Sequence, residues 1–558
     1  MKRRRREGIF FLMCFWILVG LSVEGQVVSE ALPLHGVPLL SGGFGELRST
    51  HFHSGVDLKT GGRTGLAVLC VKDGLLARVK VSSTGYGKAL YMEHADGTTT
   101  VYGHLEQFNG KITRLVRERQ YRQESFAVDL EDAKQYGLFF RRGDTLAWSG
   151  NTGSSGGPHL HFEYRDTRSE RLINPLHYFS IKDQIAPVIR SLYLYAVTDS
   201  GRVRQLQTIT PRRVGSRRYA GGQIGVPAGR IGVGFYLTDA MNDSWNKLGV
   251  YKLRLEVDDR VVFQLQADTA SFDQNRLVND LKDYTLYQEK GQTVYRCFGN
   301  FVSRILGVEC IDKGHIKVEK GEEIPVRVEV SDINGNRSEM SFKLRGGEKL
   351  LPEDKKIVHY EQSHLLQEGP YSLELKAGAL FSSVERVVRT DSLTDNEGML
   401  RNVFVTAEKE VPLSVNSVLR VQGKYDTRTV ICRVGPGQRL AALPTFRDEE
   451  SIYSFVPVLG RYTVVLDSVP PEIIYKGRRG DRFRFQIKDL LSGIASWRGE
   501  VNGKWTLFEY DMKSGMLWCK RNEPAFIKGK SNRIRLSVTD GAGNKAQCEI
   551  KVEITPSE

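Results

Sequence analysis

The sequence lacks three features that would place it in special classes of protein. Beyond its first 25 residues, no apolar run approaches the roughly 18–20 residues that cross a bilayer, so the bulk of the chain is not embedded in a membrane. Proline is sparse, at 18 of 558 residues, and no Gly-X-Y period occurs, which excludes a collagen-like or mucin-like stalk. No Cys-x-x-Cys pair occurs, which argues against a cysteine-held zinc site. A folded chain of this length predicts about three to five domains.

Cysteine is also scarce: the chain has seven, and one of them, Cys14, lies in the N-terminal apolar segment. In an oxidising compartment, four of the others form two candidate disulfides, because the members of each pair lie within one predicted domain: Cys297 with Cys310, and Cys519 with Cys548. Cys70 and Cys432 lie in strand-like apolar runs, and we expect them to be buried free thiols.

The N-terminus has the pattern of a secretory signal. Five basic residues at positions 2–6 precede an apolar stretch from Ile9 to Leu21, and small or polar residues follow. The stretch is short for a transmembrane helix, so we expect residues 1–25 to be a signal peptide with no transmembrane segment after it. An uncleaved membrane anchor is the alternative. The chain is therefore expected to be exported.

The charge of the chain is basic, with 80 Lys and Arg against 66 Asp and Glu, a formal net charge of +14. Without residues 1–25, which hold five bases and two acids, the net charge is +11. The basic residues are scattered and do not cluster with aromatic ones, so no nucleic-acid partner is expected. A basic exported chain is attracted to anionic polymers such as cell wall or acidic lipid, although ordinary solubilising surface charge explains the excess equally well.

Short alternating segments bounded by Gly, Asn and Asp dominate the sequence, which predicts an all-β chain. The pattern is clearest where Asp96-Gly97, a strong hairpin-turn signal, separates strand-like runs at 88–93 and 98–102. The charged segment 111–142 is partly helical in composition and is predicted to be an insertion.

Two stretches in the C-terminal two-thirds of the chain match each other at four places in the same order: Asp183–Ile189 with Asp467–Ile473, Phe235–Asp239 with Phe485–Asp489, Glu256–Arg260 with Glu500–Lys504, and Val330–Asn336 with Val538–Asn544. The order predicts two copies of one β-sandwich, at residues 181–346 with an insertion around 265–320, and at 465–558. A further β-rich domain is expected at 347–464. The shared ending, strand–Asp-x-x-Gly-Asn–strand, resembles extracellular bacterial immunoglobulin-like domains.

Histidines are concentrated near the N-terminus, where six of the eleven fall within residues 51–161: His51, His53, His94, His104, His159 and His161. The motif His53-x-x-x-Asp57 places an imidazole and a carboxylate four residues apart, and both are donors that suit zinc. The segment from Pro158 to Glu163 reads as a strand, whose period of two places His159, His161 and Glu163 on one face.

Two further segments complete the candidate site. Tyr102-Gly103-His104 places a histidine at the end of the return strand of the hairpin, where we expect it to face the same cleft. The Gly-rich stretch from Ser149 to Gly157 runs directly into the His159 strand and would let a substrate backbone approach closely. It is not a phosphate-binding loop, because neither Lys-Ser/Thr nor a helix follows it.

Taken together, these motifs resemble the lysostaphin/LytM-type zinc metalloendopeptidases over roughly residues 40–178. The resemblance implies a LytM-type antiparallel β peptidase domain with a zinc groove at residues 26–180, followed by β-sandwich domains. It implies that the domain hydrolyses peptide bonds of peptidoglycan, in cross-links or stem peptides, with a zinc-bound water as nucleophile. It also implies peptidoglycan as the partner and the periplasm or cell envelope of a bacterium as the location.

Carried over residue by residue, the resemblance assigns a role to five of the residues in these motifs. His53, Asp57 and His161 are the implied ligands of one zinc ion. His104 and His159 are the implied catalytic pair, which activates water and stabilises the oxyanion.

The two remaining histidines of the region need separate treatment. His51 lies two residues before His53 and competes with it as a ligand, but the Ser-Gly-Val-Asp continuation favours His53. We expect His51 to be exposed or to lie behind the ligands. His94, beside the Asp96-Gly97 turn, is expected at the surface.

Two functions of other classes remain as alternatives. A non-catalytic LytM-like regulator or scaffold of cell-wall hydrolases is one, although such relatives usually lack ligands and all are present here. A structural or adhesive surface protein is the other; it explains the β-rich C-terminal region but leaves the histidines unexplained. We expect the C-terminal β-domains to hold the enzyme near wall or membrane, to provide the surface for cell-envelope protein partners, and to contribute no chemistry.

Overall fold

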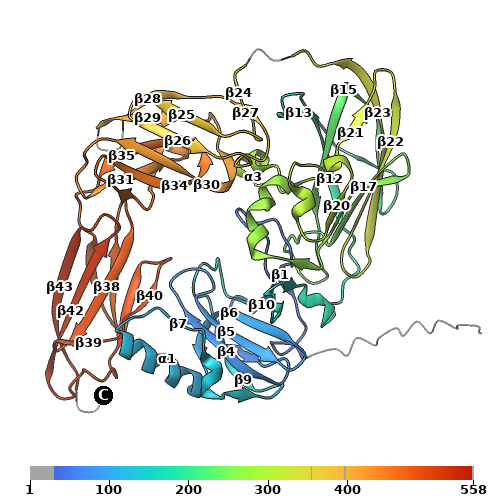
Figure 1. Ribbon diagram of the computed structural model, residues 1–558. Helices are drawn as coiled ribbons and strands as arrows, with labels where there is room; N and C mark the ends of the chain where they lie inside the picture. Colours follow the sequence, from blue (N-terminus) through green and yellow to red (C-terminus); the bar gives the residue numbers. More distant parts are fainter. Residues whose placement is uncertain (1–30, 353–354, 395–397, 556–558) are drawn as a thin grey trace, which may run out of the picture.

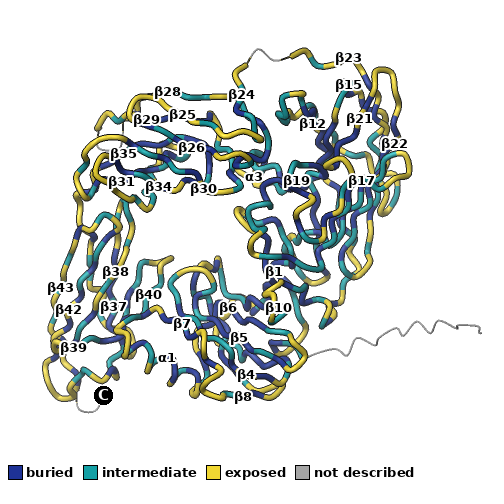
Figure 2. Tube along the Cα trace, viewed as in Figure 1, coloured by how far each residue is buried: buried dark blue, intermediate teal, exposed yellow. Residues whose placement is uncertain are grey.

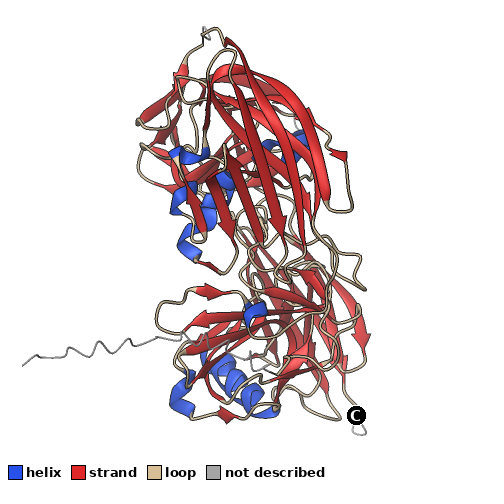
Figure 3. Ribbon diagram, turned by 90° about the vertical axis from the view of Figure 1, so that its right-hand side faces the viewer, coloured by secondary structure: helices blue, strands red, loops and turns tan. Residues whose placement is uncertain are grey.

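The computed structural model describes residues 31–352, 355–394 and 398–555, so the predicted signal peptide at 1–25 lies outside the described residues. Strands dominate and helices are few (Figure 3), which confirms the predicted all-β class. Four units follow one another around a ring (Figure 1): β1 (Leu40–Gly42) to β11 (Leu172–Ile173), β12 (Val188–Val197) to β23 (Arg337–Lys349), β24 (Ile357–Val358) to β35 (Arg461–Leu466), and β36 (Glu472–Arg479) to β43 (Lys545–Glu553). In the described ranges, no helix is long and apolar enough to cross a membrane.

The sheet of the first unit is antiparallel, and β10 lies inside it. Its main path runs β1, β2 (Val56–Lys59), β10 (His159–Asp166), β6 (Thr98–Phe108), β5 (Lys88–His94), β4 (Gly74–Val81) and β7 (Val128–Leu130). Four short strands of the first unit join this path: β3 (Ala67–Leu69), β8 (Phe139–Phe140), β9 (Thr145–Ser149) and β11. From the second unit, β18 (Thr269–Ala270) pairs with β11 and so extends the sheet of the first unit.

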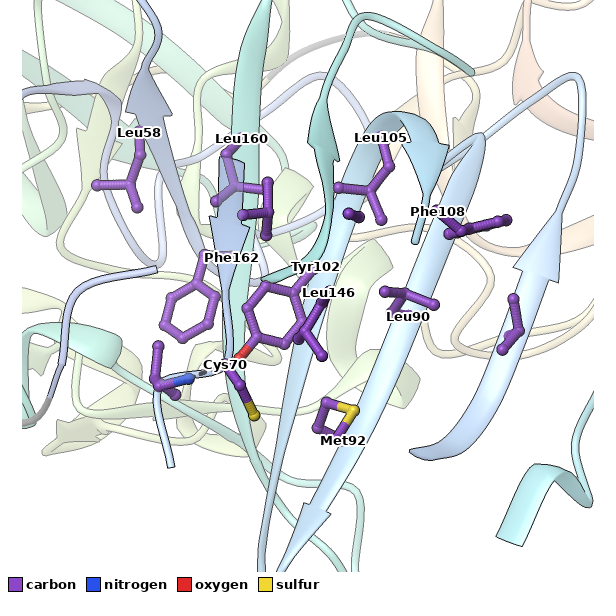
Figure 4. Packing of buried hydrophobic residues seen from close by; sticks show 14 of the residues in the cluster. Leu58, Cys70, Leu90, Met92, Tyr102, Leu105, Phe108, Leu146, Leu160 and Phe162 are labelled. Carbon is purple, nitrogen blue, oxygen red and sulfur yellow. Dashed lines mark hydrogen bonds between the residues drawn. The ribbon is translucent and has the colours of Figure 1, made fainter. Parts of the chain in front are cut away.

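The hydrophobic core of the first unit lies on one face of β10. Leu160 and Phe162 are completely buried there, together with Tyr102 of β6 (Figure 4). Because alternate residues of a strand point to opposite faces, burial of these two side chains turns His159 and His161 to the other face. The core therefore fixes the orientation of the two histidines.

The predicted insertion at 111–142 lies at the far edge of this sheet. It contains most of α1 (Gly110–Gln123), which starts where the side chain of Asn109 accepts a hydrogen bond from the backbone N–H of Ile112 at 3.1 Å. Next come β7 and β8, which pair with β4. Strands β6, β5 and β4 separate this edge from β10, so the insertion is remote from the two histidines.

The second unit is built around β15 (Arg218–Thr238), which pairs antiparallel with β12 and parallel with β23. The remaining strands of its path are β13 (Val203–Ile209), β22 (Glu323–Ser331), β16 (Lys252–Val257), β17 (Arg260–Gln266) and β20 (Val308–Cys310). The segment predicted as an insertion around 265–320 contains two short helices, α2 (Val278–Leu281) and α3 (Tyr284–Lys290).

The third and fourth units each consist mainly of two antiparallel sheets. One sheet of the third unit has the order β25 (His364–Glu368), β26 (Tyr371–Leu375), β30 (Val411–Gln422), β34 (Ser451–Leu459) and β33 (Phe446–Arg447). Its other sheet has the order β28 (Arg389–Thr394), β29 (Leu400–Val405), β35, β31 (Thr429–Val434) and β32 (Leu440–Ala442). In the fourth unit the two sheets are β36, β37 (Arg482–Lys488), β41 (Met516–Lys520) and β40 (Glu509–Asp511), and β39 (Lys504–Trp505), β38 (Ile494–Val501), β42 (Ser531–Asp540) and β43. Figure 2 shows that buried residues concentrate along the strands inside each unit.

The fourth unit closes the ring by contacting the insertion of the first unit (Figure 1). The carboxylate of Glu523, whose side chain is only 2% exposed, accepts hydrogen bonds from Arg117 at 3.1 and 2.7 Å and from the hydroxyl of Tyr121. Both donors lie on α1. A second ion pair joins Lys88 of β5 to Glu509 of β40 at 2.8 Å.

The six cysteines of the described residues are free thiols, so the two candidate disulfides are wrong. Cys519 lies on β41 and Cys548 on β43, which belong to different sheets. Cys297 follows β19 (Val294–Arg296), which pairs with β15, whereas Cys310 ends β20, which pairs with β17. The other two thiols, in strand-like apolar runs, are buried as expected.

Candidate metal centre

Strand register brings the three predicted zinc ligands together. His161 on β10 stands directly opposite Asp57 on β2, and on its other side opposite Gly103 of β6. His53 lies in the loop before β2, and Gly55 lets this loop approach β10, because a Cβ there would come within 2.2 Å of a backbone oxygen. The backbone thus fixes the positions of all three side chains.

The three side chains converge on one point. Oδ1 of Asp57 lies 3.0 Å from Nε2 of His53 and 2.9 Å from Nδ1 of His161, and these two nitrogens are 3.2 Å apart. All three residues are buried. Ligand atoms 2.0–2.1 Å from a tetrahedral zinc ion lie about 3.3 Å from one another, so the spacing fits this ion. Two imidazole nitrogens and one carboxylate oxygen are also a donor set that zinc prefers.

Hydrogen bonds on the far side of each ring decide which nitrogen carries the proton when the ring is neutral, as it is in a metal ligand. Nδ1 of His53 lies 2.6 Å from the carbonyl oxygen of Gly43, and Nε2 of His161 lies 2.8 Å from Oε1 of Glu163. Since a neutral imidazole carries one N–H, these contacts assign the N–H to the far nitrogen and a lone pair to the near one. Both rings are therefore oriented as metal ligands.

The charges around His161 favour a positive charge at this point. Burial would lower the pKa of His161, but hydrogen bonds to Asp57 and Glu163 outweigh burial and raise its pKa to about 9. Burial would likewise raise the pKa of Asp57, but the electrostatic effect of His53 and hydrogen bonds from His159 and His161 hold that pKa well below its usual range. A cation bound among these residues would supply that charge permanently.

His104 and His159 lie beside this point, with their rings 4.8 Å apart. Nδ1 of His104 donates to the carbonyl oxygen of Thr152, and Nδ1 of His159 to that of Gly157, each at 2.8 Å. Nε2 of His159 lies 3.3 Å from Oδ1 of Asp57. Burial and the neighbouring His161 and His159 lower the pKa of His104 to about 3, so its ring is neutral at neutral pH and the lone pair lies on Nε2.

Comparison with known proteins covers only part of the chain. No protein-family model matches the chain. An uncharacterized metalloprotease of Haemophilus influenzae is 30% identical over 124 residues, which make up 22% of this chain and 20% of that protein. The DD-carboxypeptidase/endopeptidase Mpg of Neisseria meningitidis is 28% identical over 151 residues, 25% of this chain and 29% of that protein. The chain thus matches less than a third of the length of either relative.

Solved structures of peptidases overlap with a similar share of the chain. The catalytic domain of lysostaphin from Staphylococcus simulans is 23% identical, with a TM-score of 0.18, over 24% of this chain and 86% of that chain. A zinc-containing peptidase from Vibrio cholerae is 25% identical, with a TM-score of 0.18, over 24% of this chain and 35% of that chain. The chain is thus similar to lysostaphin/LytM-type peptidase domains, and because the sequence motifs that resemble this family lie in the first unit, we call it the LytM-like unit. The similarity extends over about a quarter of the chain.

Behind the candidate ligands, the LytM-like unit contains a buried polar network that the sequence motifs did not assign. Glu163 is completely buried and accepts hydrogen bonds from Nε of Arg165 at 2.7 Å and from the hydroxyl of Tyr86 at 2.5 Å. Burial would raise the pKa of Glu163, but Arg165 and His161 hold it far below its usual range. The strand period that predicted the face of His161 extends to Glu163 and Arg165, so the signal for this network was present in β10.

The other two histidines of the LytM-like unit stay outside the candidate centre. His51 is exposed, and its Nδ1 lies 3.4 Å from the hydroxyl of Thr50, which agrees with the expectation. The prediction that His94 lies at the surface is wrong. His94 is 4% exposed because its ring lies between the carbonyl oxygen of Asp73, at 2.9 Å, and the hydroxyl of Thr100, at 2.8 Å.

The Gly-rich loop of the LytM-like unit is packed tightly at one point. Gly153 has a φ of +70°, and a Cβ there would come within 2.3 Å of the carbonyl oxygen of Gly85. A residue with a side chain would therefore push the loop away from this turn. The loop holds Thr152 against His104, whereas the space around Gly156 and Gly157 is open.

Proposed function

We propose that the chain is a secreted zinc-dependent endopeptidase that hydrolyses peptide bonds in peptidoglycan, in cross-links or in stem peptides. The observation that carries the proposal is the convergence of His53, Asp57 and His161 on one buried point, with His104 and His159 beside it. The names of the curated relatives, a metalloprotease and a DD-carboxypeptidase/endopeptidase, support this class of reaction.

In this proposal the zinc ion is held by His53, Asp57 and His161. When bound, zinc supplies a Lewis acid with a coordination position left for water. His104 and His159 each use Nδ1 to hold a backbone carbonyl, so Nε2 is the ring atom left to exchange a proton. The Nε2 of one neutral ring can accept the proton of the attacking water. The other ring can donate a hydrogen bond from Nε2 to the oxygen that becomes negative once it carries a second proton, because the N–H of its neutral form lies on Nδ1.

The backbone around the catalytic pair keeps these two rings in place. His104 has a φ of +59°, a left-handed conformation that a residue with a side chain adopts only when its surroundings hold it. The backbone N–H of His104 donates to the carbonyl oxygen of Tyr86 at 2.8 Å, and its ring is held by Thr152. This strain at the site supports a catalytic role for His104.

The second part of the proposal concerns place and partners. The predicted signal peptide and the net charge of +11 that follows it support export to the periplasm or cell envelope, where peptidoglycan is the substrate. The second, third and fourth units provide the surface for cell-envelope protein partners.

The proposal is tested by digesting purified sacculi with the zinc-loaded chain, residues 26–558, with and without a chelator. Mass spectrometry of the released muropeptides should show loss of cross-linked or stem-peptide species in the zinc-loaded reaction and none in the chelated one. Restoring zinc after chelation should restore cleavage, which controls for damage by the chelator. If the zinc-loaded chain binds sacculi and releases no fragment, the non-catalytic regulator is the correct function.

A further inference from the structure

Six aspartates outside the LytM-like unit form two clusters of three, one in the second unit and one in the fourth: Asp183, Asp239 and Asp332, and Asp467, Asp489 and Asp540. In each cluster, one oxygen of every carboxylate lies within 4.8 Å of the others. The members of the two clusters occupy matching places in the repeated sequence. The same three-carboxylate arrangement therefore occurs twice in this chain.

Both clusters occupy the same place in the fold. The first aspartate of each lies in the segment that leads into its unit, before β12 or before β36. The second follows the strand that pairs with this first strand, which is β15 in one unit and β37 in the other. The third stands at the end of β22 or of β42. Each cluster thus ties the entering segment to the ends of two strands.

Each cluster contains a buried carboxylate oxygen without a partner. Asp239 is 6% exposed, and its Oδ1 forms no hydrogen bond. Asp467 is 4% exposed, and its Oδ2 forms none either. Because a buried carboxylate oxygen is unfavourable without a partner, a bound cation would stabilise both oxygens.

Asparagine side chains hold the clusters in place from behind. Asn336 donates to Asp332 from its backbone N–H at 2.8 Å and from Nδ2 at 2.7 Å. The same Nδ2 lies 3.1 Å from the carbonyl oxygen of Asp183. The equivalent contacts occur in the fourth unit among Asp540, Asn544 and Asp467. In each cluster the asparagine therefore fixes one carboxylate and the backbone carbonyl of the entering aspartate before any ligand arrives.

The carboxylates of each cluster lie close together, with one oxygen of each within 4.8 Å of the others. The carboxylates repel one another in the absence of a positive charge, so a bound cation would stabilise both arrangements.

We propose that each cluster binds one calcium ion. The donors are carboxylate oxygens without histidine or cysteine, a hard set that suits Ca²⁺ and does not suit zinc, in contrast to the centre of the LytM-like unit. Ca²⁺ accepts six to eight oxygen ligands in flexible geometry, whereas Mg²⁺ demands a near-ideal octahedron, so three carboxylates completed by water favour Ca²⁺. Each ion joins the entering segment to its unit and so sets the angle between that unit and the one before it.

Calcium titration of the full chain, residues 26–558 loaded with zinc and then freed of other divalent cations, tests the proposal. Isothermal titration with Ca²⁺ alone should show two equivalents, with dissociation constants no weaker than about 1 mM, the range of extracellular calcium modules. Asp239→Asn and Asp489→Asn should each lose one equivalent, and the double variant both. Asp258→Asn is the matched control, because Asp258 lies in the exposed turn of the β16–β17 hairpin and the matching position of the fourth unit is Asn502.

Thermal unfolding of the same proteins provides a second measurement. Asparagine removes a repelling charge without changing the shape of the side chain, so both variants should melt at or above the temperature of the unaltered chain in the absence of Ca²⁺. Added Ca²⁺ should raise the melting temperature of the unaltered chain and not that of the double variant. The proposal is overturned if no heat of binding appears up to about 10 mM Ca²⁺, if Mg²⁺ binds equally tightly, or if both single variants keep two equivalents.

Discussion

Glu163 accepts a hydrogen bond from Nε2 of His161 at 2.8 Å, while Nδ1 of the same ring faces Asp57 at 2.9 Å. The carboxylate thus holds the ring in the tautomer that a metal ligand requires. Arg165 and Tyr86 hold Glu163 in turn, so the side chains of these three residues together fix the orientation of the His161 ring.

Replacing Glu163 by Gln should weaken zinc binding without removing a ligand. The amide keeps the shape but loses the charge that favours the N–H on Nε2 and leaves Arg165 without its counter-ion. Removing such a partner typically lowers metal affinity about 10–100-fold. Competition with a chromogenic chelator measures the change, and Glu106→Gln, an exposed carboxylate on β6, is the control. Equal zinc affinity of the two variants would refute a positioning role for Glu163.

Alanine substitution of any of the three candidate ligands, His53, Asp57 or His161, should remove zinc and activity together. Each variant loses one of the three protein bonds to the ion. Elemental analysis beside sacculus digestion measures both quantities. The control is His51→Ala, which alters an exposed ring two residues from His53 and should keep both. Loss of zinc from the His51 variant would shift the ligand assignment to that residue.

Substitution of the catalytic pair should separate zinc content from turnover. His159→Ala and His104→Asn should keep the metal and lose about 10²–10⁴-fold in rate, the usual contribution of a proton-transferring group. Asparagine is chosen at His104 because it tolerates the left-handed φ of +59°, where alanine would add strain. The assignment fails if His159→Ala loses zinc while His161→Ala retains it.

Replacing Glu523 by Ala should loosen the contact between the fourth unit and α1. The change leaves the hydroxyl of the half-buried Tyr121 and the guanidinium of Arg117 without their acceptor, at a cost of about 1–3 kcal/mol. Hydrogen exchange of the α1 amides should become faster, with Glu553→Ala as an exposed control in the same unit. Unchanged exchange in α1 would mean that this ion pair does not hold the ring closed.

Acid should destabilise the chain through His315. Burial and the nearby Arg230 lower its pKa to about 4, against about 6.5 in the unfolded chain. Between these values the unfolded state binds more protons, so the free energy of unfolding falls as pH drops from about 6.5 to 4. His315→Asn should remove about 2 kcal/mol of that dependence, allowing for partial solvent contact. Denaturant unfolding at pH 4 and pH 6.5 measures this change in the free energy of unfolding, with His35→Asn, which alters an exposed histidine, as the control. An equal pH dependence of the free energy of unfolding in all three proteins would contradict the prediction.

Local sequence patterns predicted which face of a strand a residue occupies, but not which residues of distant strands it contacts. The alternation along β10 placed His159 and His161 on one face, because the apolar residues between them had to enter the core. The same alternation could not identify Tyr86 as a partner of Glu163, since the contact depends on how distant strands lie together.

The errors share a physical cause, which is contact between segments far apart in the chain. His94 looked like a turn residue, but Asp73, 21 residues earlier, buries its ring. Glu523 carries no motif, and its partner Arg117 lies 406 residues away. The candidate disulfides were chosen by sequence position, but β43, which carries Cys548, contacts β36, and β37 separates β36 from β41, which carries Cys519.

The return of the fourth unit to α1 has a mechanical consequence. Domains strung on linkers can bend at one joint without disturbing the others, but here every unit has two neighbours. Strand β18 joins the second unit to the first, and Arg276 donates to Asn416 at 2.6 Å between the second and the third. Leu491 of the fourth unit packs against the cluster of the third unit that contains Val430. In a closed loop of this kind, rotating one unit requires a change in the contacts at another joint as well.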